Sequence, residues 1–348
     1  MPRSLADQVW PSGNDFQMLR TIAALAVIVS HAFALARGIA DDEPFNRSGW
    51  TPGACAVIVF FAMSGYLIAG SFERRSDFIV FATARARRII PAYLVALGVV
   101  VLGLGAATTS LSLLGYFSDP STWDFIVRHV VFDTSLKALP GVFAENPHPW
   151  TVNGSLWSLP LEVLCYAVLY GAGRLGLLHP PRCGWFFLVA MGLSAWMRVA
   201  GVGGTLPHVL PSFLTGIFLY VYRAHIPASG AWFVALLCLL WATADLPLHH
   251  EFARLVIAYG AILFATGSSA PGRLIARGGD YSYGLYLYGW PVTQTVIWAV
   301  PGVGVTALIV TAVVVAGLLA VLSWHWVEKP ALARRFNGVQ SKVPAMAG

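Results

Sequence analysis

An arginine and a histidine lie eleven positions apart in an otherwise apolar segment, RTIAALAVIVSHAF, residues 20–33. At 100° per residue, this spacing is within about 20° of three full turns, so Arg20 and His31 share one helix face. The rise between them is about 16 Å, which places His31 near the bilayer midplane if Arg20 marks its edge. An ionisable side chain at that depth is costly and indicates a functional site. A neutral histidine that hydrogen-bonds a neighbouring helix is the structural alternative.

Two further arginines, Arg85 and Arg88, lie three positions apart in the segment RARR. Residues with this spacing are neighbours on a helix surface. Their planar guanidinium groups bind phosphate through paired hydrogen bonds. The excess of positive residues on the cytoplasmic side of membrane proteins is the alternative explanation, and it is the one we prefer for Arg74, Arg75 and Arg87.

A third group lies in WTVNGSLWSLPLEVLCY, residues 150–166. Ser158, Glu162 and Tyr166 recur every four positions and therefore share a helix face. Glu162 is the one acid that we must place within a predicted span, and a glutamate there needs a partner. A histidine at similar depth, His31, is a candidate for that partner. A structural ion pair that joins two helices is the alternative.

The elements that must position these groups are membrane helices. Of the 348 residues, 57% are hydrophobic and 11% are charged, whereas a soluble domain carries about 25% charge. Residues 281–324 contain no Asp, Glu, Lys, Arg or His. As one helix this run would be about 66 Å long, far more than a bilayer core of about 30 Å, so we expect two spans joined by a turn at Pro301-Gly302.

We therefore predict an all-α, polytopic integral membrane protein with about ten transmembrane helices in a single domain, residues 1–348. The predicted spans are roughly 18–36, 53–72, 89–107, 155–173, 184–200, 206–222, 231–246, 252–268, 281–299 and 303–324. Most of the 22 Lys and Arg residues then fall on the side of both termini, which predicts cytoplasmic termini. The net charge of +6 is thus explained by topology, and a nucleic-acid partner is not expected.

Three stretches lie outside the predicted spans. Residues 73–88 are expected to form an arginine-rich cytoplasmic loop, part of which lies along the membrane as an amphipathic helix. Residues 108–154 are the one long outer loop, and loops of that length are often functional. Residues 325–348 form a short cytoplasmic tail. The four cysteines show no CxxC pairing, so neither a disulfide nor a metal site is expected.

Taken in order, several segments resemble the membrane-bound acyltransferase-3 family over about residues 15–335. They are RTIAALAVIVSHAF, VIVFFAMSGYLIAGSF, RARRIIPAY, NGSLWSLPLEVLCY, GDYSYGLYLYGWPV and WHWVEKP. Members of this family have about ten spans and O-acylate sugars and other molecules. Many of them have a histidine where this chain has Gly289, so the resemblance leaves His31 as the single base.

The resemblance implies an acyl-CoA donor, usually acetyl-CoA, that enters from the cytoplasm and is not permanently bound. The implied acceptor is a hydroxyl of a sugar, polysaccharide or lipid-linked glycan, and the implied location is the bacterial inner (plasma) membrane. Arg20, Arg85 and Arg88 would bind the nucleotide phosphates. Neutral His31 would act as general base, and Glu162 would orient its ring or stabilise the imidazolium. A covalent acyl-histidine step is the alternative to direct transfer.

Four further residues complete the predicted site. Ser158 joins the catalytic group, and Tyr166, Trp157 and Asn153 are assigned to acceptor binding. Asn153 or Ser155 is also expected to cap the helix that follows.

A proton-coupled transporter that uses His31 and Glu162 as a relay is the competing function. The absence of an internal repeat and the alignment of Arg20 with His31 count against it. A scaffold without chemistry would leave both ionisable residues unexplained.

Overall fold

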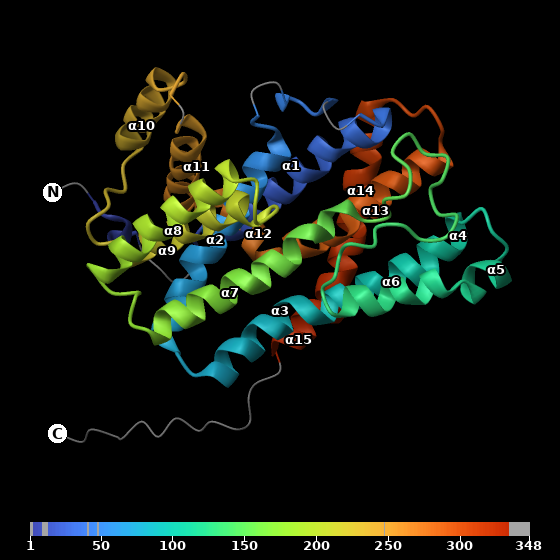
Figure 1. Ribbon diagram of the computed structural model, residues 1–348, viewed down its shortest axis with the longest axis horizontal. Coiled ribbons are helices and arrows are strands. Elements are labelled where there is room, and N and C mark those ends of the chain that lie inside the picture. Colours follow the sequence, from blue (N-terminus) through green and yellow to red (C-terminus); the bar gives the residue numbers. More distant parts are fainter. Residues whose placement is uncertain (1–2, 9–12, 40–41, 47–48, 247, 334–348) are drawn as a thin grey trace.

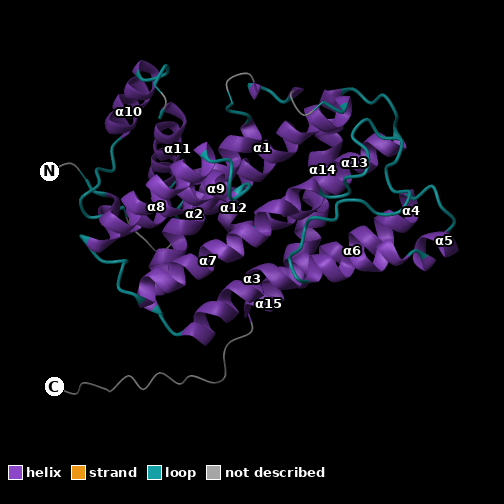
Figure 2. Cartoon of the chain, viewed as in Figure 1, coloured by secondary structure: helices purple, strands orange, loops and turns teal. Residues whose placement is uncertain are grey.

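A computed structural model describes residues 3–8, 13–39, 42–46, 49–246 and 248–333 (Figure 1). The longer helices are α1 (Phe16–Arg37), α2 (Pro52–Arg74), α3 (Phe78–Gly98), α7 (Ser158–Arg174), α8 (Arg182–Val199), α9 (Leu206–Val221), α10 (Gly230–Ala242), α11 (His249–Ala265), α13 (Ser282–Ala299) and α14 (Val305–Ser323). The shorter segments are η1 (Leu5–Asp7), η4 (Val99–Gly105), α4 (Ala106–Thr108), α5 (Leu113–Ser118), α6 (Pro120–Val130), η5 (Gly154–Trp157), α12 (Ala270–Gly278), η6 (Trp324–Glu328) and α15 (Lys329–Ala333). Within the described ranges only helices and loops are drawn (Figure 2), which confirms the all-α prediction.

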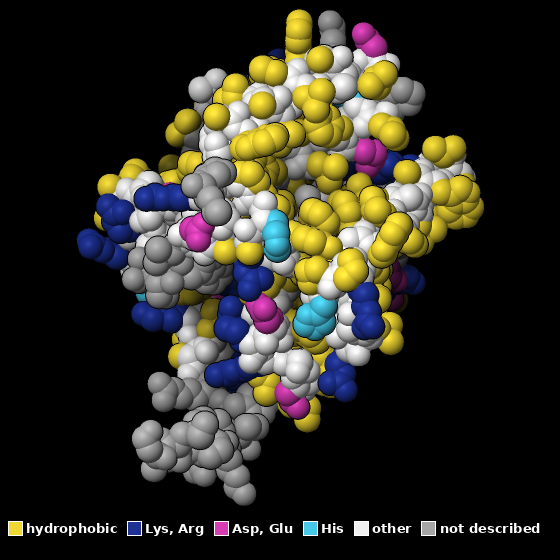
Figure 3. All heavy atoms as spheres, turned by 90° about the vertical axis from the view of Figure 1, so that its left-hand side faces the viewer, with side chains coloured by type: hydrophobic (Ala, Val, Ile, Leu, Met, Phe, Trp, Pro, Cys, Tyr) yellow, Lys and Arg dark blue, Asp and Glu magenta, His cyan; other side chains and the backbone are white. Residues whose placement is uncertain are grey.

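A helix overlaps each of the ten predicted spans. Five continuous helical stretches are long and apolar enough to cross a membrane, and they are Phe16–Arg37, Pro52–Arg74, Phe78–Thr108, Gly154–Arg174 and Val305–Ala333. A sixth is added if α11 and α12, which meet at an angle of 81°, form one broken span. The protein is therefore a multi-pass membrane protein, while the count of ten and the cytoplasmic termini stay predictions. Hydrophobic side chains cover much of the face in Figure 3, as contact with lipid requires.

The predicted loop over 73–88 is shorter than expected, because most of this stretch is helical. Helix α2 ends at Arg74 and α3 begins at Phe78, so only residues 75–77 lie outside helices. The side chain of Asp77 caps α3 by accepting a hydrogen bond of 2.9 Å from the backbone N–H of Val80. The alanines before and between the arginines favour helix, and Arg85 and Arg88 lie near the middle of α3.

The stretch 108–154 contains helix as well as loop. Short helices α5 and α6 pack against the end of the third span, at the end of the molecule opposite α10 and α11 in Figure 1. The hydroxyl of Tyr116 donates a hydrogen bond of 2.9 Å to the carbonyl of Val101, and Phe125 and Phe143 are buried in the same cluster. These contacts hold the stretch as a folded cap on α3 and η4.

The predicted tail over 325–348 is only partly a tail. Residues 325–333 continue α14 as the π-helix η6 and the helix α15, and they bring Glu328 into a buried position. Residues 334–348 lie outside the described residues. Residues 325–333 are helical because of their composition, since WHWVE is aromatic and apolar enough to extend the span.

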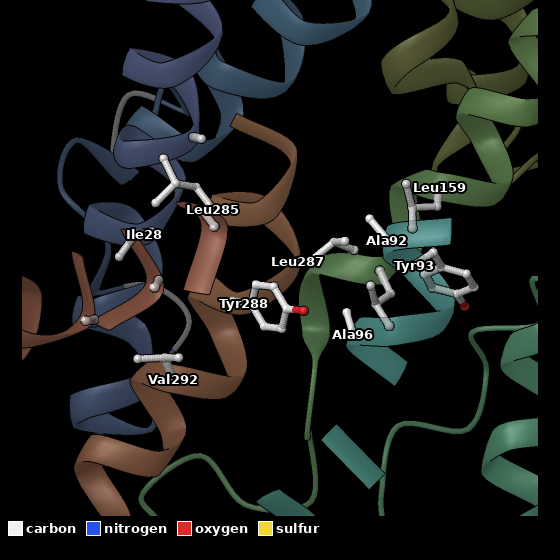
Figure 4. Packing of buried hydrophobic residues seen from close by; sticks show 14 residues of the cluster. Ile28, Ala92, Tyr93, Ala96, Leu159, Leu285, Leu287, Tyr288 and Val292 are labelled. Atoms are coloured by element: carbon white, nitrogen blue, oxygen red, sulfur yellow. The ribbon is translucent and has the colours of Figure 1, made fainter. Parts of the chain in front are cut away.

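Helices α1, α3, α7, α13 and α14 meet in the main core. Figure 4 shows Ile28 and Val292 from α1 and α13 on one side, and Ala92 and Leu159 from α3 and α7 on the other. Helices α1 and α13 come close because α13 carries Gly289 where a Cβ would lie 2.7 Å from Cγ1 of Ile28. This close approach lets α1 pack along α13.

Candidate active site

One cavity of about 300 Å³ brings most of the predicted site residues together. Its walls come from α1, α2, α3, α7 and α13 and from the loops that precede α2 and α7. The predicted residues in its lining are Arg20, His31, Arg85, Arg88, Trp157, Ser158, Glu162 and Tyr166. A second cavity of about 420 Å³ shares Arg20, Arg85 and Arg88 with the first and adds Arg74 and Arg87. The arginine end of the first cavity therefore continues into a second, more basic one.

Two buried carboxylates hold two of the three arginines. Asp280, just before α13, lies 3.2 Å from Nη1 of Arg20 and 2.6 Å from Nη2 of Arg88. Glu328 of η6 lies 3.3 Å from Nη1 of Arg88. The side chains of Asp280 and Glu328 are only 7% and 2% exposed. Burial alone would raise the pKa of Asp280, but Arg88, Arg20 and hydrogen bonds from Ser282 outweigh burial and lower it to about 2.

Arg85 is bonded differently from Arg20 and Arg88. Its Nη2 donates a 3.3 Å hydrogen bond to Ser71, and its Nε is buried without a hydrogen-bond partner in the described part of the chain. Tyr166 and Glu162 lie within electrostatic range of its guanidinium group. Within the described residues no carboxylate forms an ion pair with Arg85, so it retains donors for an anion in the cavity.

His31 faces aromatic and loop residues at the other end of the cavity. Its ring packs edge-on against Trp290 of α13, with centroids 4.8 Å apart, and His148 packs against the same indole at 5.8 Å. Glu43 and His148 lie within electrostatic range of His31. Burial, with a smaller effect of Lys137, lowers the pKa of His148 and favours its neutral form.

A family model described as an acyltransferase domain matches residues 14–326 of this chain. The chain belongs to this acyltransferase family. The resemblance inferred from the six segments is thereby confirmed, and the protein is a membrane acyltransferase.

Three relatives of the acyltransferase support this assignment. It is 31% identical to an O-acetyl transferase of Shigella phage Sf6, over 92% of this chain and 96% of the relative. It is 28% identical to nodulation protein 10 of Rhizobium leguminosarum bv. viciae, over 95% and 96%. It is 29% identical to the exopolysaccharide production protein ExoZ of Rhizobium meliloti (strain 1021), over 82% and 91%. No solved structure matches it.

Glu162 of the acyltransferase accepts hydrogen bonds from side chains of α7 and α2. The hydroxyl of Tyr166 donates to it across one helical turn, and that of Ser64 donates at 3.5 Å. Among the described residues no hydrogen bond links Glu162 to His31, although both line the same cavity. Their direct pairing stays a prediction, and Glu43 is the described carboxylate within electrostatic range of His31.

Ser158 and Asn153 make structural contacts in the acyltransferase. The hydroxyls of Ser158 and Tyr286 are 2.7 Å apart, and that of Tyr286 also donates to the carbonyl of Ser155. Asn153 caps η5 by accepting from the N–H of Ser155, and its amide donates to the carbonyl of Leu287 at 3.0 Å. Asn153 thus serves as the predicted cap, and it lies outside the lining that the described residues form.

Sequence reasoning missed three acids at the site, namely Glu43, Asp280 and Glu328. Asp280 and Glu328 flank the long uncharged run on either side, and that position was a usable signal for a charge at the membrane edge. Glu43 lies in the polar stretch ADDEPF, where acids are ordinary and nothing distinguishes one from its neighbours.

Proposed function

We propose that this acyltransferase moves an acetyl group from acetyl-CoA on the cytoplasmic side to a hydroxyl of a polysaccharide or a lipid-linked glycan. The observation that carries the proposal is the single cavity lined by Arg20, Arg85 and Arg88 and also by His31. A basic end suits a nucleotide phosphate, and a histidine suits proton transfer from a hydroxyl. The names of the relatives, an O-acetyl transferase and an exopolysaccharide production protein, support the acetyl group and the saccharide acceptor.

In this proposal the arginine end binds the donor. Arg85 binds a phosphate directly, because it has buried donors and no carboxylate ion pair among the described residues. Arg20 and Arg88 add positive charge while Asp280 fixes their positions. The adenosine part occupies the second cavity, next to Arg74 and Arg87. The pantetheine arm then follows the face of α1 over a rise of about 16 Å and brings the thioester to His31.

His31 supplies the general base. Its neutral imidazole takes the proton from the acceptor hydroxyl as the hydroxyl oxygen attacks the thioester carbonyl. The tetrahedral intermediate collapses, the carbon–sulfur bond breaks, and the imidazolium returns the proton to the CoA thiolate. Glu162 and the hydroxyls of Tyr166 and Ser64, which line the same cavity, position the thioester. Ser158 and Trp157 form the adjoining wall, where the acceptor enters.

The test is a transfer assay with the purified protein in nanodiscs, using radiolabelled acetyl-CoA and a saccharide extract. We expect His31→Ala to bind acetyl-CoA normally and to lose about 10²–10⁴ in transfer rate, which is typical of a missing general base. His325→Ala is the matched control, because His325 is exposed on η6 and lies outside both cavities.

Mass spectrometry of cell-envelope and secreted glycans gives the cellular counterpart. Deleting the gene should remove an increment of about 42 Da, the mass of C2H2O, and His31→Ala should not restore it. Near-normal transfer by His31→Ala would mean that His31 serves only in helix packing. A protein that moves a solute without consuming acetyl-CoA would be a transporter instead.

A further inference from the structure

We propose that Glu43, in the loop between α1 and α2, is the positioning residue for His31. It orients the imidazole ring and stabilises the positive charge that the ring acquires during transfer. This inference rests on the proposed function, because it assigns a partner to the base named there. Glu43 lines the same cavity as His31, and it reaches the cavity from outside the helices.

Glu43 is hydrogen-bonded to the residue that precedes His31 on α1. The hydroxyl of Ser30, the residue that precedes His31, donates a hydrogen bond to Oε2 of Glu43. The carboxylate also faces the first turn of α2, where a Cβ built on Gly53 would lie 3.8 Å from the same oxygen. The amino end of a helix favours a negative charge. Both contacts hold the Glu43 carboxylate beside Ser30, the residue that precedes His31.

The loop that carries Glu43 is held in place by its own turns and by neighbouring elements. The N–H of Asn46 donates to the carbonyl of Glu43 at 3.1 Å. Gly38 at the start of the loop has φ of +71°, and it packs so closely on the backbone of Pro147 that any Cβ would overlap it. At the other end, Trp50 packs on His250 of α11 with ring centroids 5.3 Å apart. A carboxylate on such a loop can orient an imidazole with little loss of entropy.

The alternative partner for His31, Glu162, is hydrogen-bonded to other side chains. Glu162 accepts hydrogen bonds from Tyr166 and Ser64. Among the described residues, the ionisable groups within electrostatic range of His31 are Glu43 and His148, and of these two Glu43 is the acid. When His31 takes up the proton of the acceptor, Glu43 is therefore the group that stabilises the imidazolium.

The experiment compares Glu43→Gln, Glu43→Asp and Asp42→Asn in the nanodisc assay. Asp42 is the matched control, because it is adjacent in the same loop but pairs with Arg37 at 3.2 Å. For Glu43→Gln we expect kcat to fall at least tenfold while the KM for acetyl-CoA stays unchanged. The acid limb of the kcat profile should move to lower pH by about one unit, because a negative charge that favours imidazolium is lost. Glu43→Asp should recover part of kcat, and Asp42→Asn should behave as the wild type.

A structural role would give a different pattern. If Glu43→Gln lowers kcat only in proportion to the folded fraction, with the acid limb unmoved, Glu43 merely ties the loop to α1 and the inference is overturned. If Glu43→Gln does not fold, Ser30→Ala keeps the carboxylate but removes its tether, and an unchanged kcat in that variant would also overturn it. An active His31→Ala would refute the proposed function itself, whereas an inactive His31→Ala beside a fully active Glu43→Gln would refute only the role of Glu43.

Discussion

The two ends of the cavity are built in different ways. At the arginine end, Arg20 and Arg88 project from helices onto Asp280 and Glu328, and the charges are balanced by short ion pairs. At the histidine end, His31 comes from a helix, but the groups around it include Glu43 and His148, which come from loops.

In the proposed function, this difference separates charges that hold the fold from charges that serve the reaction. The ion pairs of Asp280 and Glu328 join α1, α3, the start of α13 and η6 at one place. We propose that Arg85, which forms no ion pair with a described carboxylate, and His31, which contacts Trp290, bind the substrates. Substitutions in the first group should therefore reduce stability, and those in the second should reduce activity.

The largest expected effect on the structural side comes from Arg88→Ala. It removes a partner of both Asp280 and Glu328 and leaves the buried Glu328 without its ion pair. Loss of one partner of a buried pair costs about 3–5 kcal/mol, so the thermal unfolding temperature in nanodiscs should fall sharply. Arg87→Ala, one position earlier, is the control. Equal unfolding temperatures for the two variants would break the comparison between the two ends.

Asp280→Asn should cost about 2 kcal/mol at neutral pH, given a pKa lowered from 3.8 to about 2. The lowered pKa means that the ionised folded state is favoured. The contribution is therefore fully present above pH 3.8 and disappears as the pH falls through about 2. Unfolding measured at pH 7, 4 and 2 should show the gap between wild type and variant closing toward the lowest pH. A gap that does not depend on pH would mean that the Asp280 carboxylate is not the stabilising group.

Arg85→Lys should raise the KM for acetyl-CoA about tenfold, because an ammonium cannot reproduce the paired hydrogen bonds of a guanidinium. The KM for the acceptor and the unfolding temperature should change little, in contrast to Arg88→Ala. Isothermal titration with CoA checks binding directly, with Arg75→Lys as the control, because Arg75 is exposed and lines neither cavity. Normal CoA affinity in the Arg85 variant would mean that Arg85 reflects only the excess of positive residues on the cytoplasmic side.

The smallest expected effect is that of Glu162→Gln. The amide keeps the shape and one accepting oxygen for Tyr166 and Ser64, but it removes the charge. A change of about 1 kcal/mol, or about fivefold in kcat, is typical of one weakened hydrogen bond. Steady-state kinetics should show kcat falling more than the affinity for acetyl-CoA. A rise in the acetyl-CoA KM alone would instead place Glu162 with the donor-binding arginines.

The helical part of the site was predictable from the sequence because helix geometry is local. The spacing of Arg20 and His31 implies one face of one helix, and both side chains do line one cavity. The contact between Glu162 and Tyr166 follows from their spacing in the same way. Such inferences need only the number of residues between two groups.

The remaining site residues depend on contacts between distant parts of the chain. Nothing near Asp280 or Glu328 in the sequence indicates that both meet Arg88. Glu43 lies in a stretch between Gly38, which contacts Pro147, and Trp50, which packs on His250, and such contacts follow no sequence periodicity. The error over 73–88 has a local cause, since a run of arginines suggested a loop where alanines and the Asp77 cap favour a helix.

The ion pairs at the arginine end also impose an order on assembly. The chain is made from its amino end, so Arg20 and Arg88 are synthesised long before Asp280 and Glu328, their partners in the folded protein. An unfinished chain carries these two positive charges without their carboxylates. The arginine end of the cavity is completed only when the start of α13 and the π-helix η6 have docked, so a partly synthesised chain lacks this arrangement of charges.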